Sequence, residues 1–257
     1  MRLIILGSGT SFGVPVIGCR CRVCTSDDPR DRRTRTAAVV EAEDGSRLLI
    51  DTPPELRLQL VQAGVGTVDA VLYTHEHADH IHGIDDLRAV SVRHGQLPVY
   101  GPPETIDLLL DRFGYIFDAS VAPPPGSCLP ELTPIPLEPY REITVAGMPV
   151  LPLEFDHGGP RVFGYRIGAL AYLTDVKAAA EAALRELGGV KVLVVNALFE
   201  QPHPTHLSIP EAVELSHTVS AERTYLTHLT HRYSHADLEA RLPAGVSPAY
   251  DGLAVSF

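Results

Sequence analysis

Three histidines and an aspartate lie close together in the segment Thr74-His75-Glu76-His77-Ala78-Asp79-His80, directly after a short apolar run. This segment is the strongest indication of the fold. That run, Ala70–Tyr73, has the apolar and β-branched composition of a buried strand. Side chains packed so closely at the end of a strand can converge on a small volume. Neutral imidazole and carboxylate are ligands of zinc, manganese and iron. The H-x-H-x-D-H string therefore predicts a metal site, with an exposed polar turn as the alternative.

The rest of the chain alternates short strands with helices. Turn-bounded apolar runs predict strands at Leu3–Leu6, Ala37–Ala42, Arg47–Ile50, Ala70–Tyr73, Val150–Glu154, Phe163–Ile167, Ala171–Leu173, Val192–Val195 and Thr224–Leu226. Helical patterns predict helices at Pro54–Ala63, Pro103–Phe113, Ala178–Leu187, Ile209–Val219 and His235–Leu242, with caps near Thr52, Ser208 and Ser234. The early half is expected to be richer in strands, and the proline-rich segment Val121–Pro139 to cross the surface between the halves. This order favours an α/β fold with two sheets packed face to face and helices outside.

The H-x-H-x-D-H string after a strand resembles the signature of the metallo-β-lactamase superfamily. This resemblance implies a four-layer αββα sandwich with a dinuclear metal site between two mixed sheets. The other expected elements follow in order along nearly the whole chain, so residues 1–257 are expected to form a single domain of this type. Leu49-Ile50-Asp51 resembles the early strand whose aspartate braces the ligand loop.

The resemblance also assigns the remaining ligands, each at the end of a predicted strand. These are His157 in Phe155-Asp156-His157-Gly158, Asp175 in Tyr172-Leu173-Thr174-Asp175, and His228 in Tyr225-Leu226-Thr227-His228. It implies two divalent metals, zinc or manganese, that share and activate a water. One metal is assigned to His75, His77 and His157, and the other to Asp79, His80 and His228, with Asp175 between them. Taken alone, a strand-end histidine is more simply a hydrogen-bonded loop residue and a lone aspartate a cap.

A second cluster of candidate ligands is the C-x-C-x-x-C run formed by Cys19, Cys21 and Cys24. Three thiolates need one more ligand for a closed tetrahedral zinc site. The PhnP-like branch of the superfamily carries such a run, completed by a histidine three residues beyond the last active-site ligand, which is His231 here. The resemblance thus implies a structural zinc that joins the N-terminal loop to the loop of His228. Cys128 as the fourth ligand, or thiols without metal, are the alternatives.

The segment His203-Pro204-Thr205-His206-Leu207-Ser208 lies just before a predicted helix. In PhnP-like and ribonuclease Z-like proteins a histidine at this place is the proposed general acid. His206, nearer to the Ser208 cap than His203, is the better match, and a histidine can protonate a departing alkoxide. Together with Asp79, His206 is our candidate catalytic residue. The alternative is a histidine that only holds the loop.

Two further motifs have simpler interpretations. The segment Gly7–Gly13 has the spacing G-x-G-x-x-x-G, one residue longer than the dinucleotide fingerprint, so we expect a tight turn near the metal cleft and no nucleotide cofactor. The arginines of the segment Arg30–Arg35 could bind a phosphate. We favour a solvated face balanced by the neighbouring acidic residues at 27, 28 and 31.

Composition limits the partners. The net charge of -11 disfavours extended nucleic acid, because phosphate backbones need clustered Lys and Arg. No apolar run approaches the roughly 20 residues of a membrane span, so no membrane partner is expected. Closely spaced cysteines suit a metal in a reducing compartment, which predicts a cytoplasmic location. Proteins of the PhnP-like branch are often dimers, so a homodimer is an expectation from resemblance.

The resemblance to the PhnP-like branch implies a metal-dependent phosphodiesterase acting on a small phosphorylated sugar or nucleotide. Its implied substrate is the cyclic diester 5-phosphoribosyl 1,2-cyclic phosphate. Three other functions remain: a ribonuclease Z-like 3′-tRNA endonuclease, a thioesterase of the glyoxalase II type, and a catalytically inactive metal-binding scaffold. The net charge of -11 weighs against the endonuclease, and the full set of predicted ligands weighs against the scaffold.

Overall fold

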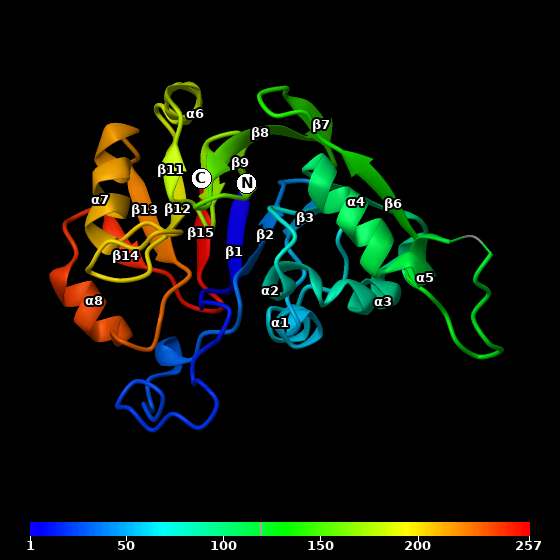
Figure 1. The fold of residues 1–257 in the computed structure, drawn as a ribbon, viewed down its shortest axis with the longest axis horizontal. Helices are drawn as coiled ribbons and strands as arrows, with labels where there is room; N and C mark the ends of the chain where they lie inside the picture. The colour runs from blue at the N-terminus through cyan, green and yellow to red at the C-terminus, as the bar shows by residue number, and fades with distance from the viewer. Residues whose placement is uncertain (119) are drawn as a thin grey trace.

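The computed structural model describes residues 1–118 and 120–257 and shows two β-sheets packed face to face, with helices on both outer faces (Figure 1). The first sheet contains, in spatial order, β15 (Ala254–Ser256), β1 (Arg2–Gly7), β2 (Ala37–Glu41), β3 (Arg47–Ile50), β4 (Ala70–Leu72), β5 (Leu97–Gly101) and β6 (Leu132–Pro136). Strands β15 to β3 pair antiparallel and β3 to β6 pair parallel, so this sheet is mixed.

The second sheet repeats this mixed pattern. Its spatial order is β11 (Ala178–Ala179), β8 (Met148–Asp156), β9 (Arg161–Ile167), β10 (Leu170–Leu173), β12 (Val192–Asn196), β13 (Arg223–Thr227) and β14 (Val246–Pro248), and β7 (Ile143–Val145) also pairs with β8. Strands β8 to β10 pair antiparallel, and β10 to β14 pair parallel.

Helices from the two halves of the chain cover opposite faces of the sandwich (Figure 1). The first sheet is covered by α1 (Leu56–Gln62), α2 (Ala78–Ile81), α3 (Arg88–His94), α4 (Pro103–Arg112) and α5 (Gly114–Phe117). The second sheet is covered by α6 (Glu181–Leu187), α7 (Ile209–Thr218) and α8 (His235–Arg241). Two short 3-10 helices, η1 (Pro29–Asp31) and η2 (Ile84–Leu87), lie in the connections.

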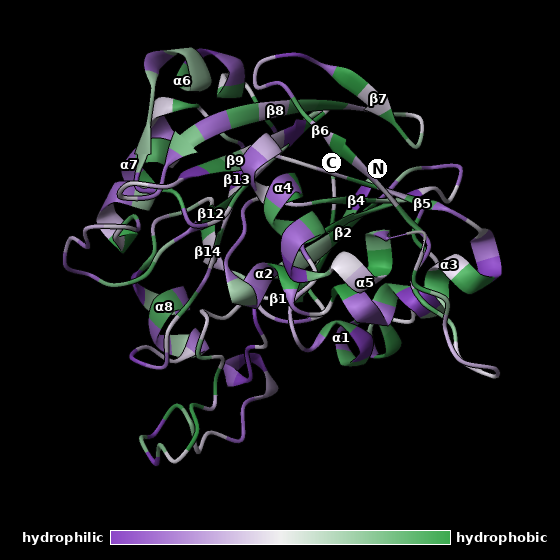
Figure 2. Ribbon diagram, turned by 45° about the vertical axis from the view of Figure 1, so that its right-hand side comes forward, coloured by the Kyte–Doolittle hydropathy of each residue, from purple (hydrophilic) through white to green (hydrophobic). Residues whose placement is uncertain are grey.

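Three hydrophobic layers hold the four-layer sandwich together, because successive residues of a strand point to opposite faces. In β1, Leu3 and Ile5 pack between the sheets, whereas Ile4 and Leu6 pack in the layer that includes α1 to α4. Strand β12 alternates in the same way between the central layer and the layer of α6 to α8. Figure 2 shows the corresponding mixture of hydrophobic and hydrophilic residues on outer helices such as α4. The strands are apolar on both faces because both faces are buried.

The predicted αββα fold class is confirmed, and each predicted strand is present with ends within two residues of its expected bounds. Ser208 and Ser234 cap α7 and α8 through capping boxes. Thr52 is not a cap: its hydroxyl lies 3.1 Å from the hydroxyl of Tyr73 and 3.2 Å from the carbonyl oxygen of Ile81. It therefore joins the loop after β3 to the loop after β4.

Three other expectations need correction. Residues 178–179, predicted as the start of a helix, form β11, and α6 begins at Glu181. The segment Val121–Pro139 contains β6, whose Pro134 and Pro136 are tolerated because β6 is an edge strand of its sheet. The early half is not dominated by strands, since α1 to α5 lie there. Within the described residues, no helix has both the length and the apolarity needed to cross a membrane.

Candidate metal centre

Every predicted ligand of the metal centre lies in a segment that follows a strand, and two of them, Asp79 and His80, lie in the short helix α2 within such a segment. The segment 74–80 follows β4, His157 follows β8, Asp175 follows β10 and His228 follows β13. Asp51 follows β3, which pairs parallel with β4. The two sheets thus bring loops of distant sequence to one edge of the sandwich.

Asp175 lies at the centre of the cluster, and its two oxygens have different neighbours. Oδ2 lies 3.8 Å from Nε2 of His75 and 3.7 Å from Nε2 of His157. Oδ1 lies 3.7 Å from Nε2 of His80 and 3.4 Å from Nε2 of His228. Two ligands of one metal, each about 2.0–2.2 Å from the ion at a tetrahedral angle, are separated by similar distances. The carboxylate therefore has the geometry of a bridge between two metal positions.

Side chains grouped around the two oxygens complete two sets of donor atoms. His75, His77, His157 and Asp175 form one set, and Asp79, His80 and His228 form the other, with the donor atoms of each set within 4.8 Å of one another. Nε2 of His75 lies 2.9 Å from Nδ1 of His77, and Nε2 of His80 lies 3.5 Å from Asp79. The structure thus brings together all seven residues predicted for the dinuclear site, in the predicted grouping.

The loop residues at the centre adopt strained backbone conformations. Asp51, Asp175 and His228 have positive φ angles of 62°, 58° and 56°. A non-glycine residue in this region costs of order 1–3 kcal/mol and persists only where its surroundings hold it. The strain therefore marks these three side chains as aimed into the site by the surrounding structure.

Hydrogen bonds to Nδ1 orient three of the histidines with Nε2 toward the centre. Nδ1 of His80 lies 2.7 Å from the carboxylate of Asp51, and Nδ1 of His157 lies 2.8 Å from the carbonyl oxygen of Thr205. Both oxygens can only accept, so Nδ1–H donates in each case. Thr74 gives its hydroxyl proton to Asp51 at 2.9 Å, which leaves its oxygen free to accept from Nδ1 of His75 at 3.0 Å. These contacts fix the orientation of each ring with Nε2 toward the centre, and they place the proton on Nδ1 whenever the ring is neutral.

The donor atoms and electrostatics of the site fit divalent metal. Nε2 of His80 and Nε2 of His228 are buried without a hydrogen-bond partner, although buried polar atoms are rarely left unsatisfied. Burial lowers the pKa of His75 well below its usual value and that of His228 to about 4, so both rings are neutral at pH 7. Burial opposes protonation of His80 too, but Asp51 and Asp175 hold its pKa well above the usual value. These carboxylates thus favour positive charge at the centre.

Supporting residues that the sequence analysis missed hold the ligand loops in place. The side chain of Asn196, at the end of β12, binds both backbone groups of Val176 at 2.7 and 3.1 Å and so fixes the loop of Asp175. Thr74 and Thr205 orient His75 and His157 as described above. A buried polar residue at a strand end was the available signal for Asn196, but its partner is set by the pairing of β10 with β12.

Removal of the Asp51 carboxylate tests this support. In Asp51→Asn, which keeps the shape of the side chain, metal affinity is expected to fall by about 10–100-fold because His80 loses a charged hydrogen-bond acceptor. Metal titration measures the change. Asp69→Asn, an exposed aspartate that accepts from the backbone of Arg47 at 2.7 Å, is the matched control and should bind metal normally. Equal affinities in the two variants would show that Asp51 does not orient a ligand.

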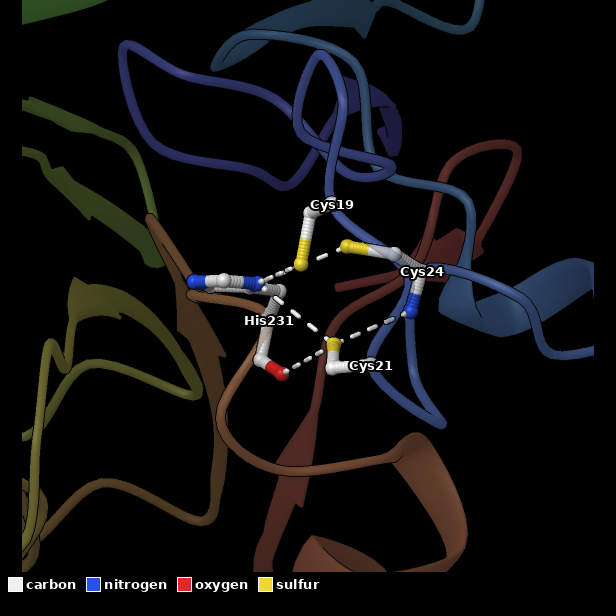
Figure 3. Close-up of side chains that lie close together, drawn as sticks. All are labelled: Cys19, Cys21, Cys24 and His231. Carbon is white, nitrogen blue, oxygen red and sulfur yellow. Dashed lines mark hydrogen bonds between the residues drawn. The ribbon is translucent and has the colours of Figure 1, made fainter.

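The three clustered cysteines lie around His231 (Figure 3). Nδ1 of His231 is 3.4 Å from Sγ of Cys19, 3.6 Å from Sγ of Cys21 and 3.4 Å from Sγ of Cys24. With metal–sulfur and metal–nitrogen bonds of about 2.3 and 2.1 Å, the edges of a tetrahedral zinc site have this length. The histidine assembled with these cysteines is the predicted one, whereas Cys128 does not belong to the cluster.

The thiols also have the hydrogen-bond donors expected around thiolates. The backbone N–H of Cys24 donates to Sγ of Cys21 at 3.5 Å and lowers the pKa of Cys21 to about 6. Sγ of Cys24 accepts from the backbone N–H of Val16 at 3.3 Å, although burial raises the pKa of this thiol to about 11. Metal coordination deprotonates such a thiol outright.

His206 lines a cavity of about 350 Å³ together with Ser11 and several of the candidate ligands. Its Nε2 lies 3.3 Å from Oδ2 of Asp175, and its ring stacks on that of His228 with centroids 4.7 Å apart. The hydroxyl of Thr205 holds Nδ1 at 2.8 Å. His203 does not line this cavity. The structure therefore brings His206, of the two candidate histidines, to the metal centre.

The arginine cluster needs a partial correction. Arg33 is not on a solvated face: it is fully buried and donates to the carbonyl oxygens of Thr230 at 2.5 Å and Tyr233 at 3.0 Å. It thereby fixes the loop that carries His231. Arg30 pairs with Asp28 at 2.9 Å on the surface, as expected for a solvated residue.

Residues 46–229 match the family model described as "Beta-lactamase superfamily domain". A crystal structure of "a New Diphosphatase from the PhnP Family" superposes with a TM-score of 0.91 at 37% identity, covering 100% of this chain and 97% of that one. The chain belongs to the PhnP-like branch of the metallo-β-lactamase superfamily. The His and Asp donor sets described above suit divalent metal binding in this fold.

The names of other relatives of this PhnP-like protein describe different functions. An octanoyltransferase of Porphyromonas gingivalis is 40% identical over 258 residues, which are 98% of this chain and 51% of that protein. The coenzyme PQQ synthesis protein B of Methylobacterium radiotolerans is 37% identical over 101 residues, 34% of each protein. This chain thus spans about half the length, or less, of these curated relatives. The short form of human tRNase Z shares the fold, with a TM-score of 0.70 at 19% identity over 100% of this chain and 99% of that one.

Proposed function

We propose that this protein is a phosphodiesterase that hydrolyses a small cyclic phosphodiester, 5-phosphoribosyl 1,2-cyclic phosphate, at a centre of two divalent metals. The observation that carries the proposal is the position of Asp175, with each oxygen facing a separate set of donor atoms and His206 beside it. The two sets of donor atoms around Asp175 contain imidazole nitrogen and carboxylate oxygen, which suit zinc and manganese.

In the proposed reaction, two bound metals would lower the pKa of water at the site and neutralise the phosphate oxygens. His75, His77, His157 and Asp175 would hold one metal, and Asp79, His80 and His228 the other, with Asp175 shared. Asp51 keeps His80 oriented. His206 lines the cavity and would give its proton to O2 of the ribose as the bond from phosphorus to O2 breaks and the oxygen of water bonds to phosphorus. The 2-hydroxyl is thereby freed, and the phosphate stays on O1.

The size and charge of the cavity favour a small substrate. Its volume is about 350 Å³, and no Lys or Arg is among the described residues that line it. The chain carries a net charge of -11. A long RNA needs many phosphate contacts from basic residues. These features therefore disfavour the ribonuclease Z-like activity and support a single phosphodiester whose charge is met by metal.

We further propose that residues 1–257 act as one domain in the cytoplasm and form a homodimer. Sedimentation tests the oligomeric state.

Turnover of the metal-loaded protein tests the proposal. We expect 5-phosphoribosyl 1,2-cyclic phosphate to be opened to ribose 1,5-bisphosphate, with phosphorus NMR as the measurement. A precursor tRNA should be left intact. If protein with a full complement of metal hydrolyses no phosphodiester, the proposal is rejected. The catalytically inactive metal-binding scaffold is then the better interpretation.

A second candidate is thioester hydrolysis of the glyoxalase II type, which the octanoyltransferase relative favours because octanoyl transfer is acyl chemistry. That relative is about twice as long as this chain, so its name describes a larger protein. Hydrolysis of an octanoyl thioester, followed by release of free thiol, separates this activity from the first. A thioesterase leaves a thiolate and does not need His206 as a proton donor.

The cysteine cluster is proposed as a structural zinc site, and Cys21→Ser tests it. The variant should lose about one metal per chain and unfold at a lower temperature, because binding of a structural zinc contributes directly to folding free energy. His231→Ala should behave alike, although His231 is only three residues from His228. Elemental analysis and thermal melting are the measurements. The control is Cys128→Ser, whose thiol lies outside the cluster, and an unchanged metal content in Cys21→Ser would contradict the assignment.

A further inference from the structure

A second cavity, of about 210 Å³, lies beside the metal cavity and is lined by two aromatic rings, those of Phe12 and Phe199. Three consecutive residues of one loop contribute to the lining of the two cavities. Ser11 lines the metal cavity, whereas its neighbours Thr10 and Phe12 line the second one. The same short loop thus contributes to the lining of both cavities.

The loop that presents Phe12 is held rigidly. The backbone N–H of Gly13 donates to the carbonyl oxygen of Thr10 at 2.8 Å, and Nε of Arg35 donates to that of Ser11 at 2.8 Å. A Cβ at Gly9 would lie 2.7 Å from the carbonyl oxygen of Arg33, so the loop packs closely on its neighbour. Despite this anchoring, Phe12 is 74% exposed. A large apolar ring is therefore fixed at the surface without packing against the core.

Two other residues that line the cavity, Phe199 and Arg232, contact each other, and His203 contacts Phe199 edge-on from outside the cavity lining. The guanidinium of Arg232 lies over the ring of Phe199, 4.4 Å from its centroid. His203 lies 5.8 Å from Phe199 and 5.5 Å from His206, between centroids. This row of planar side chains runs from the proposed proton donor to the aromatic cavity.

We infer that this cavity is a subsite for the nucleobase of a nucleotide substrate, whose phosphate is held at the metal centre. An isolated exposed phenylalanine is ordinary, but here it shares a cavity with an arginine-stacked ring next to the proposed reaction centre. Bases stack on aromatic and guanidinium planes with little dependence on their identity. The volume is below the roughly 300–1,000 Å³ of pockets for drug-sized ligands, so it suits a single base. The inference rests on the proposed phosphodiesterase function and widens its substrate class: it adds cyclic nucleotides, which carry a base, to 5-phosphoribosyl 1,2-cyclic phosphate, which carries none.

Binding of two phosphate monoesters, one with a base and one without, tests the subsite independently of turnover. We expect metal-loaded protein to bind AMP at least about tenfold more tightly than ribose 5-phosphate, measured by isothermal titration calorimetry. Phe12→Ala should abolish this preference and Phe12→Tyr should retain it. The matched control is Ile17→Ala, which removes another exposed apolar side chain, 99% exposed, from the same N-terminal segment but outside the cavity. Thermal melting should be unchanged in all three variants, since neither side chain is buried.

Equal affinities of the wild-type protein for AMP and ribose 5-phosphate would overturn the inference. So would an equal loss of affinity for both ligands in Phe12→Ala, which would indicate a general disturbance of the metal cavity. Hydrolysis of 2′,3′-cyclic AMP, compared with 5-phosphoribosyl 1,2-cyclic phosphate, extends the test to turnover: Phe12→Ala should raise KM about tenfold for the nucleotide alone. A wild-type protein that prefers AMP yet hydrolyses neither diester would reject the proposed function and keep the base subsite.

Discussion

Asp175→Asn should abolish turnover of any phosphodiester and release metal from both proposed positions. The reason is that one carboxylate serves both donor sets: Oδ2 lies 3.8 Å from His75 and 3.7 Å from His157, and Oδ1 lies 3.4 Å from His228. An amide carries no charge and offers one oxygen instead of two. The loss should exceed the roughly 10²–10⁴-fold that removal of a proton donor alone costs.

Asparagine is the informative replacement at this position because Asp175 has a φ of 58°. Asn tolerates the left-handed region far better than Ala does, so the variant changes the carboxylate without adding backbone strain. Asp44→Asn is the control, since Asp44 is exposed and accepts from the backbone of Ser46 at 2.9 Å in a turn far from the site along the chain. Metal is counted by elemental analysis. Full metal and full turnover in Asp175→Asn would show that this side chain does not bridge metals.

His206→Ala should lower kcat on a cyclic phosphodiester with an alkoxide leaving group by roughly 10²-fold or more. The structure places Nε2 of His206 at 3.3 Å from Asp175, on the wall of the metal cavity. Bound metal should be unchanged if the ring donates a proton and is not a ligand. The loss should shrink on bis(p-nitrophenyl) phosphate, because p-nitrophenolate is a stable anion that needs little protonation as it leaves.

The comparison of two leaving groups separates proton donation from other roles of His206. Equal losses on both substrates would mean that the ring binds phosphate or supports its loop. Loss of metal would instead make it a ligand, since Asp175, His206 and His228 also lie close enough to hold an ion together. His203→Ala is the matched control: this ring neighbours His206 at 5.5 Å but does not line the metal cavity, so alkoxide turnover should persist.

Much of the fold could be predicted because both faces of its strands are buried. Runs such as Val192–Val195 are apolar throughout, and such runs bounded by turns stand out in a sequence. Strands β5, β6, β7, β14 and β15 were missed because none of them is buried along its whole length. They are also short, and β6 contains Pro134 and Pro136. Each is a strand because it pairs with a neighbouring strand, and its own residues give no strand pattern. Helix α2 was missed because its four residues, Ala78–Ile81, lie inside the ligand motif and are too few for a helical pattern.

The residues of the metal centre also differ in how far the sequence predicted them. The motif from His75 to His80 could be recognised locally, since its donor atoms are neighbours along the chain and need only a strand and a turn to converge. His157, Asp175 and His228 were assigned through resemblance, because nothing local distinguishes a strand-end ligand from a loop residue. Only the tertiary structure decided that the two oxygens of Asp175 face different histidines.

The tertiary structure also decided the roles of residues whose partners are distant. Arg33 was expected on the surface from its acidic neighbours, yet it is buried against carbonyl oxygens about 200 residues away, at Thr230 and Tyr233. Phe12 and Arg232 come to line one cavity because the loop after β1 pairs with the loop after β13 through Gly9 and Leu229. Local sequence encodes periodicity and turns over a few residues. Contacts between loops arise only once both sheets have formed and packed, which no single stretch of the chain specifies.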